Sequence, residues 1–182
     1  MTIRNTTRSW GSLSKALHWL IVLLIINQWV IAERAASLPK GPALINALGW
    51  HKSFGITILM LAVIRLVWRW MNPVPDLTAE TRPWERGLAR LSHVLLYALI
   101  FAMPLSGWTM SSARSFPVSW FGFFQLPDLV TADPHLYERL RGLHHLLFGV
   151  LVAVAALHVA GALKHHFIDR NDVLRRMLPF VR

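Results

Sequence analysis

The sequence predicts an all-α integral membrane protein, folded as a four-helix up-and-down bundle. Of its 182 residues, 54% are hydrophobic and only 15% are charged, whereas a soluble domain usually carries about a quarter charged residues. Four apolar runs are long enough to cross a hydrocarbon core about 30 Å thick. They lie at roughly 17–32, 54–70, 88–110 and 143–163. Pro104 falls in the third run, where a membrane bundle tolerates a kink. We expect one domain over residues 1–182.

The distribution of charge also favours a membrane protein. The net charge is +10, but nucleic-acid-binding proteins gather their basic residues on one face, and here Lys and Arg flank the apolar runs. We therefore expect membrane lipid as a partner and no nucleic acid. The chain has no cysteine, which excludes iron–sulfur clusters, thiolate metal sites and covalent c-type haem attachment within it.

Basic residues also predict the orientation. Roughly two thirds of the 19 Lys and Arg residues precede the first run, lie in or near the connection between the second and third, or follow the fourth, so both termini are expected in the cytoplasm. The first run partly imitates a signal peptide, because Ala35 and Ala36 follow it. Since it contains His18, Asn27 and Gln28 and three more runs follow, we interpret it as a retained helix.

The longest connection joins the third and fourth runs and is rich in aromatic residues. It contains Trp120, Phe121, Phe123 and Phe124. We expect this loop to lie on the outer surface and to cover something there.

Histidines inside the runs carry the functional hypothesis, because an ionisable residue in a membrane span is costly. His144 and His158 are 14 positions apart, so they share one helix face and are separated by roughly 21 Å along the axis. His18 lies near the inner end of the first run and His51 near the outer end of the second. The topology pairs His51 with His144 at the outer level and His18 with His158 at the inner level. Two bis-histidine haems require such pairs.

Other interpretations of these histidines have specific weaknesses. A hydrogen-bonded structural role suits one histidine better than four at paired depths. Zinc would need carboxylate or thiolate companions to complete a tetrahedron, and a proton pathway would need a continuous file of ionisable groups. Periodicity cannot choose between His18 and His93, which lies near the inner end of the third run. His145 points about 100° away from His144.

Several short motifs resemble one family. They are His18-Trp19, Gly49-Trp50-His51, the histidines of the fourth run, LKHHF at 163–167 and LRRMLP at 174–179. Over nearly its whole length the chain resembles the prokaryotic cytochrome b-561 family of di-haem membrane cytochromes.

The resemblance implies a ligand set and a function. It implies that His18, His51, His144 and His158 hold the iron of two haem b groups, and thus favours His18 over His93. It implies electron transfer in the bacterial inner membrane between a small outer-face donor and ubiquinone, an exchangeable substrate, with a superoxide:ubiquinone oxidoreductase type of activity. The alternative is a membrane-anchoring cytochrome b subunit of a larger oxidoreductase; short termini favour a stand-alone enzyme. Catalytic residues, the physiological donor, and the choice between a homo-oligomer and a partner reductase stay open.

Two further sites are hypotheses. His165 lies seven positions beyond His158, on about the same face and nearer the inner surface; we expect it to hydrogen-bond a quinone carbonyl, with an interfacial snorkelling histidine as the alternative. Outer cations could pair with haem propionates or attract an anion such as superoxide, with ordinary solvated loop charges as the alternative. These cations are Lys52, Arg114, Arg139 and Arg141.

Overall fold

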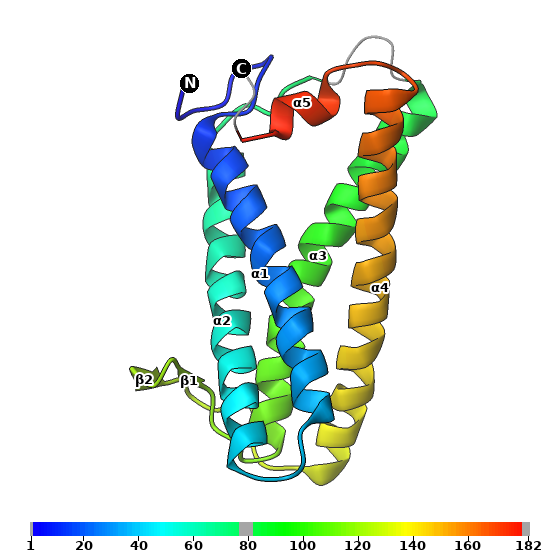
Figure 1. Cartoon of the computed structure of the whole chain (residues 1–182). Helices are drawn as coiled ribbons and strands as arrows, with labels where there is room; N and C mark the ends of the chain where they lie inside the picture. The colour runs from blue at the N-terminus through cyan, green and yellow to red at the C-terminus, as the bar shows by residue number, and fades with distance from the viewer. Residues whose placement is uncertain (1, 77–81, 180–182) are drawn as a thin grey trace.

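The computed structural model describes residues 2–76 and 82–179 and contains four long helices arranged as a bundle (Figure 1). The elements are α1 (Ser12–Ser37), α2 (Pro42–Trp70), α3 (Pro83–Ala113), β1 (Ser119–Trp120), β2 (Phe124–Gln125), α4 (Pro134–Phe167) and α5 (Val173–Met177). All four long helices are long and apolar enough to cross a membrane, which confirms the predicted four-span fold. Within the predicted domain, residues 1, 77–81 and 180–182 lie outside the described residues.

Each long helix extends beyond the apolar run that predicted it, because polar turns continue the helix past the hydrocarbon. Pro42, Pro83 and Pro134 each occupy the first turn of their helix, where the missing N–H of proline costs no hydrogen bond. Asp133 caps α4 and accepts from the N–H groups of His135 and Leu136 at 2.8 and 3.1 Å. Because α2 begins at Pro42, His51 lies well inside this helix.

The helices pack in chain order. α1 packs on α2, α2 on α3 and α3 on α4, whereas α1 and α4 have few direct contacts. Large apolar side chains point outward from the bundle, and Leu157 is 71% exposed, as expected where lipid is the solvent. Few apolar side chains of the described residues are fully buried; they include Leu17, Ile21, Ile56 and Leu151.

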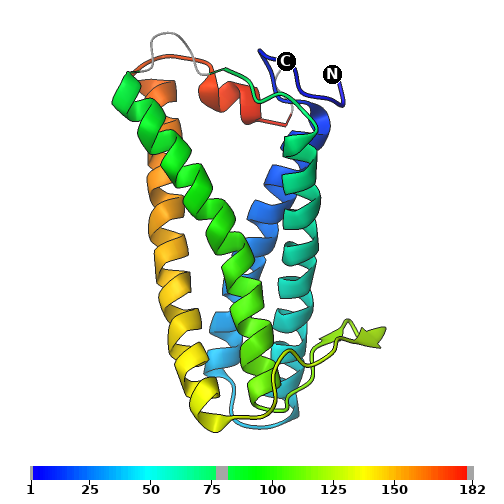
Figure 2. The ribbon, with the colours of Figure 1, turned by 180° about the vertical axis from the view of Figure 1, so that it is seen from behind.

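One end of the bundle gathers the N-terminal segment, the start of the α2–α3 connection and α5 (Figure 2). Lys15 Nζ donates to the carbonyl of Leu178 at 3.0 Å, and Trp19 Nε1 donates to the carbonyl of Met177 at 2.9 Å. We call this the inner end and the opposite end the outer end. Its assignment to the cytoplasm stays a prediction from the basic residues.

Candidate functional site

The outer histidine pair joins two helices that lie diagonally across the bundle. The ring centroids of His51 on α2 and His144 on α4 are 6.4 Å apart. Two imidazoles that bind one metal from opposite sides have centroids about 6 Å apart, because a metal–nitrogen bond is about 2 Å long. The spacing of this pair fits a metal held between the two rings.

A hydrogen bond determines which nitrogen of His144 is free. Ser106 Oγ lies 2.9 Å from His144 Nδ1, and the Ser106 hydroxyl donates its single proton to the carbonyl of Met103 at 2.8 Å. Ser106 Oγ must therefore accept from Nδ1–H of His144. The lone pair of His144 is then on Nε2, the nitrogen that remains available as a ligand, in the way a hydrogen-bonded partner commonly orients metal-binding histidines.

His51 contains an unpaired buried nitrogen. Its backbone carbonyl accepts from Gln28 Nε2 at 2.9 Å, which ties α2 to α1 at this level. Its Nδ1 is buried and has no hydrogen-bond partner among the described residues. A buried polar atom without a partner requires an explanation, and a group supplied from outside the chain provides one.

The inner pair has the same ring separation as the outer pair. His18 on α1 and His158 on α4 have centroids 6.4 Å apart, whereas His93 on α3 is 5.2 Å from His158. The shorter distance leaves too little room for a metal between opposite imidazoles, given the separation of about 6 Å that such coordination needs. This geometry supports His18 over His93 as the partner of His158, and His93 lies beside the pair.

Glycines leave room near the histidines of α4. A Cβ atom built at Gly149 or Gly161 would meet no described atom within 4 Å, whereas one at Gly107 would lie 3.2 Å from Cε1 of His144. A large planar group can lie close to a helix backbone where the residue is glycine, because glycine has no side chain in the way. The residues present therefore fit a haem beside each pair.

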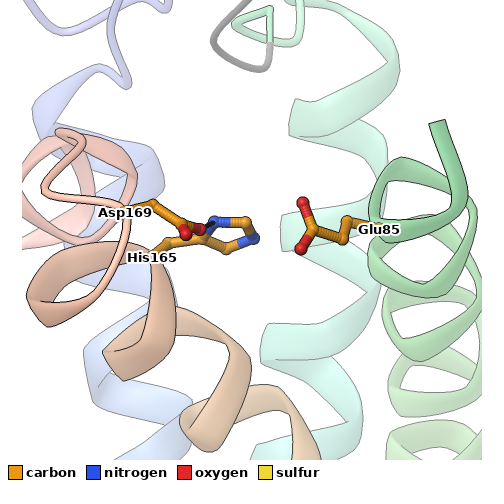
Figure 3. A group of neighbouring side chains, drawn as sticks. All are labelled: Glu85, His165 and Asp169. Atoms are coloured by element: carbon orange, nitrogen blue, oxygen red, sulfur yellow. Dashed lines mark hydrogen bonds and ion pairs between the residues drawn. The ribbon is translucent and has the colours of Figure 1, made fainter. Parts of the chain in front are cut away.

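A polar cluster lies at the inner end, between α3 and the end of α4 (Figure 3). Lys164 Nζ lies 2.5 Å from Glu85 Oε1 and 2.7 Å from Asp169 Oδ2, and the same Asp169 oxygen lies 2.7 Å from His165 Nδ1. The side chain of His165 is only 13% exposed. The hydrogen bond from Lys164 lowers the pKa of Asp169 below its usual value, so this carboxylate is ionised at neutral pH.

The sequence analysis singled out His165 but not the other three members of this cluster. Asp169 follows His165 at the four-residue spacing that brings helix side chains together, and that signal was readable. Glu85 and Lys164 lie 79 positions apart, so no local pattern could join them. The Lys164 ammonium contacts both carboxylates and offsets one of their two negative charges.

Comparison with known proteins identifies the family. The model of the prokaryotic cytochrome b561 family matches residues 9–180. The chain belongs to this family. It is 35% identical to Cytochrome b561 homolog 2 of Escherichia coli (strain K12), with 98% of this chain and 95% of that protein aligned. It is 30% identical to Probable superoxide oxidase CybB of Yersinia pestis, with 94% and 97% aligned, and 25% identical to Cytochrome b562 of Cereibacter sphaeroides, with 89% and 90% aligned.

Membership in the cytochrome b561 family confirms the predicted class and location. The chain is a multi-pass cytochrome of the bacterial inner membrane that binds b-type haem and transfers electrons. Which histidines hold the haem, and how many haems there are, stay predictions.

The outer cations of this cytochrome are not gathered into one site. Lys52 Nζ donates to the carbonyl of Pro117 at 2.6 Å and lies 3.6 Å from the Phe116 ring centroid. Arg114 donates to the Tyr137 hydroxyl at 2.7 Å, and Arg141 pairs with Glu138 at 3.6 Å. Arg139 is exposed and forms no ion pair within residues 2–76 and 82–179. The predicted anion contacts stay untested, and Arg139 is one of the outer cations accessible to a solute.

The Ser106 hydrogen bond predicts the effect of a mutation. In Ser106→Ala, His144 loses the acceptor of its Nδ1–H; if His144 holds haem iron as predicted, it then becomes a poorer electron donor to that iron. We expect the midpoint potential of one haem to rise and its affinity to fall by about tenfold to a hundredfold, the usual cost of losing such a partner. Redox titration followed by absorption measures both effects.

Thr109→Ala is the matched control, because within the part of the chain that the structure describes the Thr109 hydroxyl bonds only the carbonyl of Leu105 in its own helix, at 2.8 Å. Equal potentials and equal haem retention in the two variants would contradict the role assigned to Ser106.

Proposed function

We propose that this chain is an oxidoreductase that passes electrons from a small outer-face donor, superoxide, to ubiquinone in the membrane. Two b-type haems would be held by His51 with His144 and by His18 with His158. One observation carries the proposal: two imidazole pairs with the same centroid separation of 6.4 Å lie at two depths of one bundle. Roughly 21 Å of helix separates His144 from His158, so the two pairs lie toward opposite sides of the membrane.

The overall reaction is balanced in electrons and protons. Two superoxide ions lose one electron each and become two molecules of oxygen, and ubiquinone takes up two electrons and two protons to become ubiquinol. The haems supply one-electron transfer when bound. Held between paired imidazoles, each haem would supply this electron transfer without a change of ligands, and the chain's own task would be to hold the rings and exclude water.

Superoxide as the donor is supported by one relative and by charge. Probable superoxide oxidase CybB of Yersinia pestis aligns with 94% of this chain. The outer end carries Lys52, Arg114, Arg139 and Arg141, and cations at this face favour the approach of an anion. Arg139, exposed at the outer end, is the side chain from which we expect the largest share of the local attraction.

Ubiquinone binding at the inner end is supported by His165. It lies two helical turns beyond His158, roughly 10 Å along the axis, and Asp169 accepts a hydrogen bond from its Nδ1. Nε2 is then the nitrogen that can face a substrate. When His165 is protonated, Nε2–H donates to a quinone carbonyl and can deliver one of the two protons, and Asp169 holds the ring in place.

The haem assignment predicts a pattern of stoichiometry. We expect about two haems per chain in the unmodified protein, because two coordinating pairs are present. His18→Ala, His51→Ala, His144→Ala and His158→Ala should each retain about one haem, because each loses one ligand of one pair. The pyridine haemochrome assay measures the haem content.

His93→Ala is the control and should keep both haems, because the ring spacing excludes His93 from opposite coordination. Loss of a haem in His93→Ala, together with two haems in His18→Ala, would reverse the inner assignment.

The donor and acceptor predict an activity of the purified chain. In liposomes that contain ubiquinone, an external superoxide source should produce ubiquinol, and added superoxide dismutase should abolish the signal. The rate should fall as ionic strength rises, because salt screens attraction over about 10 Å at 0.1 M, and Arg139→Gln should weaken this dependence.

Ubiquinol formation that requires a co-purifying soluble reductase would favour the alternative, a membrane-anchoring electron-transfer subunit. A rate of ubiquinol formation that is independent of ionic strength would show that electrostatic attraction does not bring superoxide to the outer end.

The Asp169 contact predicts a selective defect at the quinone end. Asp169→Asn should lower ubiquinone reduction roughly tenfold, the scale on which a partner that orients a functional histidine acts, while haem content stays unchanged. Because the pKa of Asp169 is lowered, the carboxylate keeps its charge down to acidic pH, so the difference from wild type should persist at neutral pH. It should disappear as the pH falls below the usual carboxylate range.

Asp172→Asn is the matched control, since Asp172 pairs with Arg176 at 2.8 Å on the exposed surface near by. Equal rates of ubiquinone reduction for Asp169→Asn and Asp172→Asn over the whole pH range would contradict the assignment of Asp169 and His165 to the quinone site.

A further inference from the structure

The connection between α3 and α4 extends sideways past the outer part of α2 before it returns to the start of α4 at the outer end (Figures 1 and 2). Its β1–β2 hairpin pairs Ser119 with Gln125 and Trp120 with Phe124. Two α2 side chains hold it there. The Phe121 N–H donates to Ser53 Oγ at 3.0 Å, and Trp120 Nε1 donates to Thr57 Oγ1 at 3.1 Å.

The depth of these two contacts follows from the helix rise. α2 has 29 residues and is therefore roughly 43 Å long, whereas the hydrocarbon core is about 30 Å thick. Ser53 and Thr57 lie roughly 16 and 22 Å from the outer end of α2, measured at 1.5 Å per residue. If the hydrocarbon is centred on α2, both residues lie within it; if it begins at the apolar run 54–70, Ser53 lies at its outer boundary. In both cases the hairpin lies beside the membrane-spanning part of α2.

The composition of the hairpin suits an apolar medium. Residues 116–127 contain no charged side chain, and Phe123 and Phe124 are 79% and 54% exposed. The Phe121 ring packs against Trp50 and Phe54 of α2, with centroid distances of 5.6 and 5.2 Å. The aromatic surface is thus continuous with Trp50, which is itself 49% exposed on α2.

The backbone of the hairpin is also prepared for such a medium. Non-helical backbone is tolerated at membrane depth only where its polar groups find partners. Besides the Phe121 N–H, the Phe123 N–H donates to the carbonyl of Trp120 at 3.0 Å and the Leu126 N–H donates to the carbonyl of Val118 at 2.8 Å. Ser53 Oγ lies 3.0 Å from the carbonyl oxygen of Ser119. Gly122 adopts φ 79°, a conformation that glycine accommodates without strain, and so completes the tight turn.

We propose that the hairpin of residues 119–125 is inserted in the outer leaflet, with Phe123 and Phe124 in contact with lipid acyl chains. It is an in-plane anchor attached to the side of α2. The occupant is lipid because depth, charge and backbone pairing all match the hydrocarbon that already surrounds α2. The anchor belongs to the same connection as Phe116 and Pro117. The carbonyls of these two residues accept hydrogen bonds from Lys52, which is next to His51 in the chain.

The absence of cysteine allows a direct test in the full-length, haem-loaded protein. Phe123→Cys and Phe124→Cys are each labelled with the environment-sensitive dye NBD and reconstituted in phosphatidylcholine vesicles. Thr131→Cys is the matched control, because Thr131 is exposed on the same connection, beyond the hairpin. Haem absorption verifies that each variant is folded.

We expect blue-shifted emission at positions 123 and 124, and quenching by 5-doxyl phosphatidylcholine at least threefold stronger than at position 131. Aqueous iodide should show the opposite order. Iodide quenching at 123 and 124 equal to that at 131, with no effect of doxyl lipid, would place the hairpin in water and overturn the proposal. Self-quenching that grows with the protein-to-lipid ratio and is insensitive to doxyl lipid would instead assign the surface to a second copy of the chain, and would equally overturn it.

Discussion

The hydrocarbon of the membrane offers no hydrogen-bond partner, and this constraint governs every polar side chain within the four spans. His144 meets Ser106 from α3, and Lys52 meets the carbonyls of the outer connection. Lys164 meets two carboxylates at the inner end. Gln28 Oε1 and His51 Nδ1 are exceptions among the described residues of the spans, and His51 faces a second imidazole at a metal-compatible distance. The polar side chains of the helices are therefore concentrated at a few depths, and apolar side chains cover most of the bundle between those depths.

Most of the fold was readable from the sequence because the signals are local. Apolar runs identify spans, and the interval between His144 and His158 gives both a shared face and a vertical separation. The family resemblance, carried by short motifs, was confirmed by the family match. Most helix ends lie a turn or more beyond the predicted runs, because hydropathy detects the lipid-facing part and not the polar turns; α2 is an exception and ends at Trp70, as its run does. The N-terminal prolines of α2, α3 and α4 carried that information.

Contacts between distant segments were not readable. The positions of α1 and α3 relative to α4 decide which histidine, His18 or His93, lies at a metal-compatible distance from His158. Helix periodicity does not reveal those positions. Ser106 and His144 are 38 positions apart, so the hydrogen bond that sets the tautomer needed the tertiary structure. Likewise, Lys52 counted as an outer cation in the sequence, whereas its ammonium group is directed to loop carbonyls and an aromatic ring.

The sparse contact between α1 and α4 has a consequence for biogenesis. Since each helix packs on its neighbour in the chain, successive helical hairpins can associate as they emerge into the bilayer. The seam between the first and last helices then depends on side chains, among them Trp29 with Phe148 and His18 with His158. If His18 and His158 bind one haem, as proposed, capture of that haem would join the first and last membrane helices. Maturation would then couple completed synthesis to closure of the bundle.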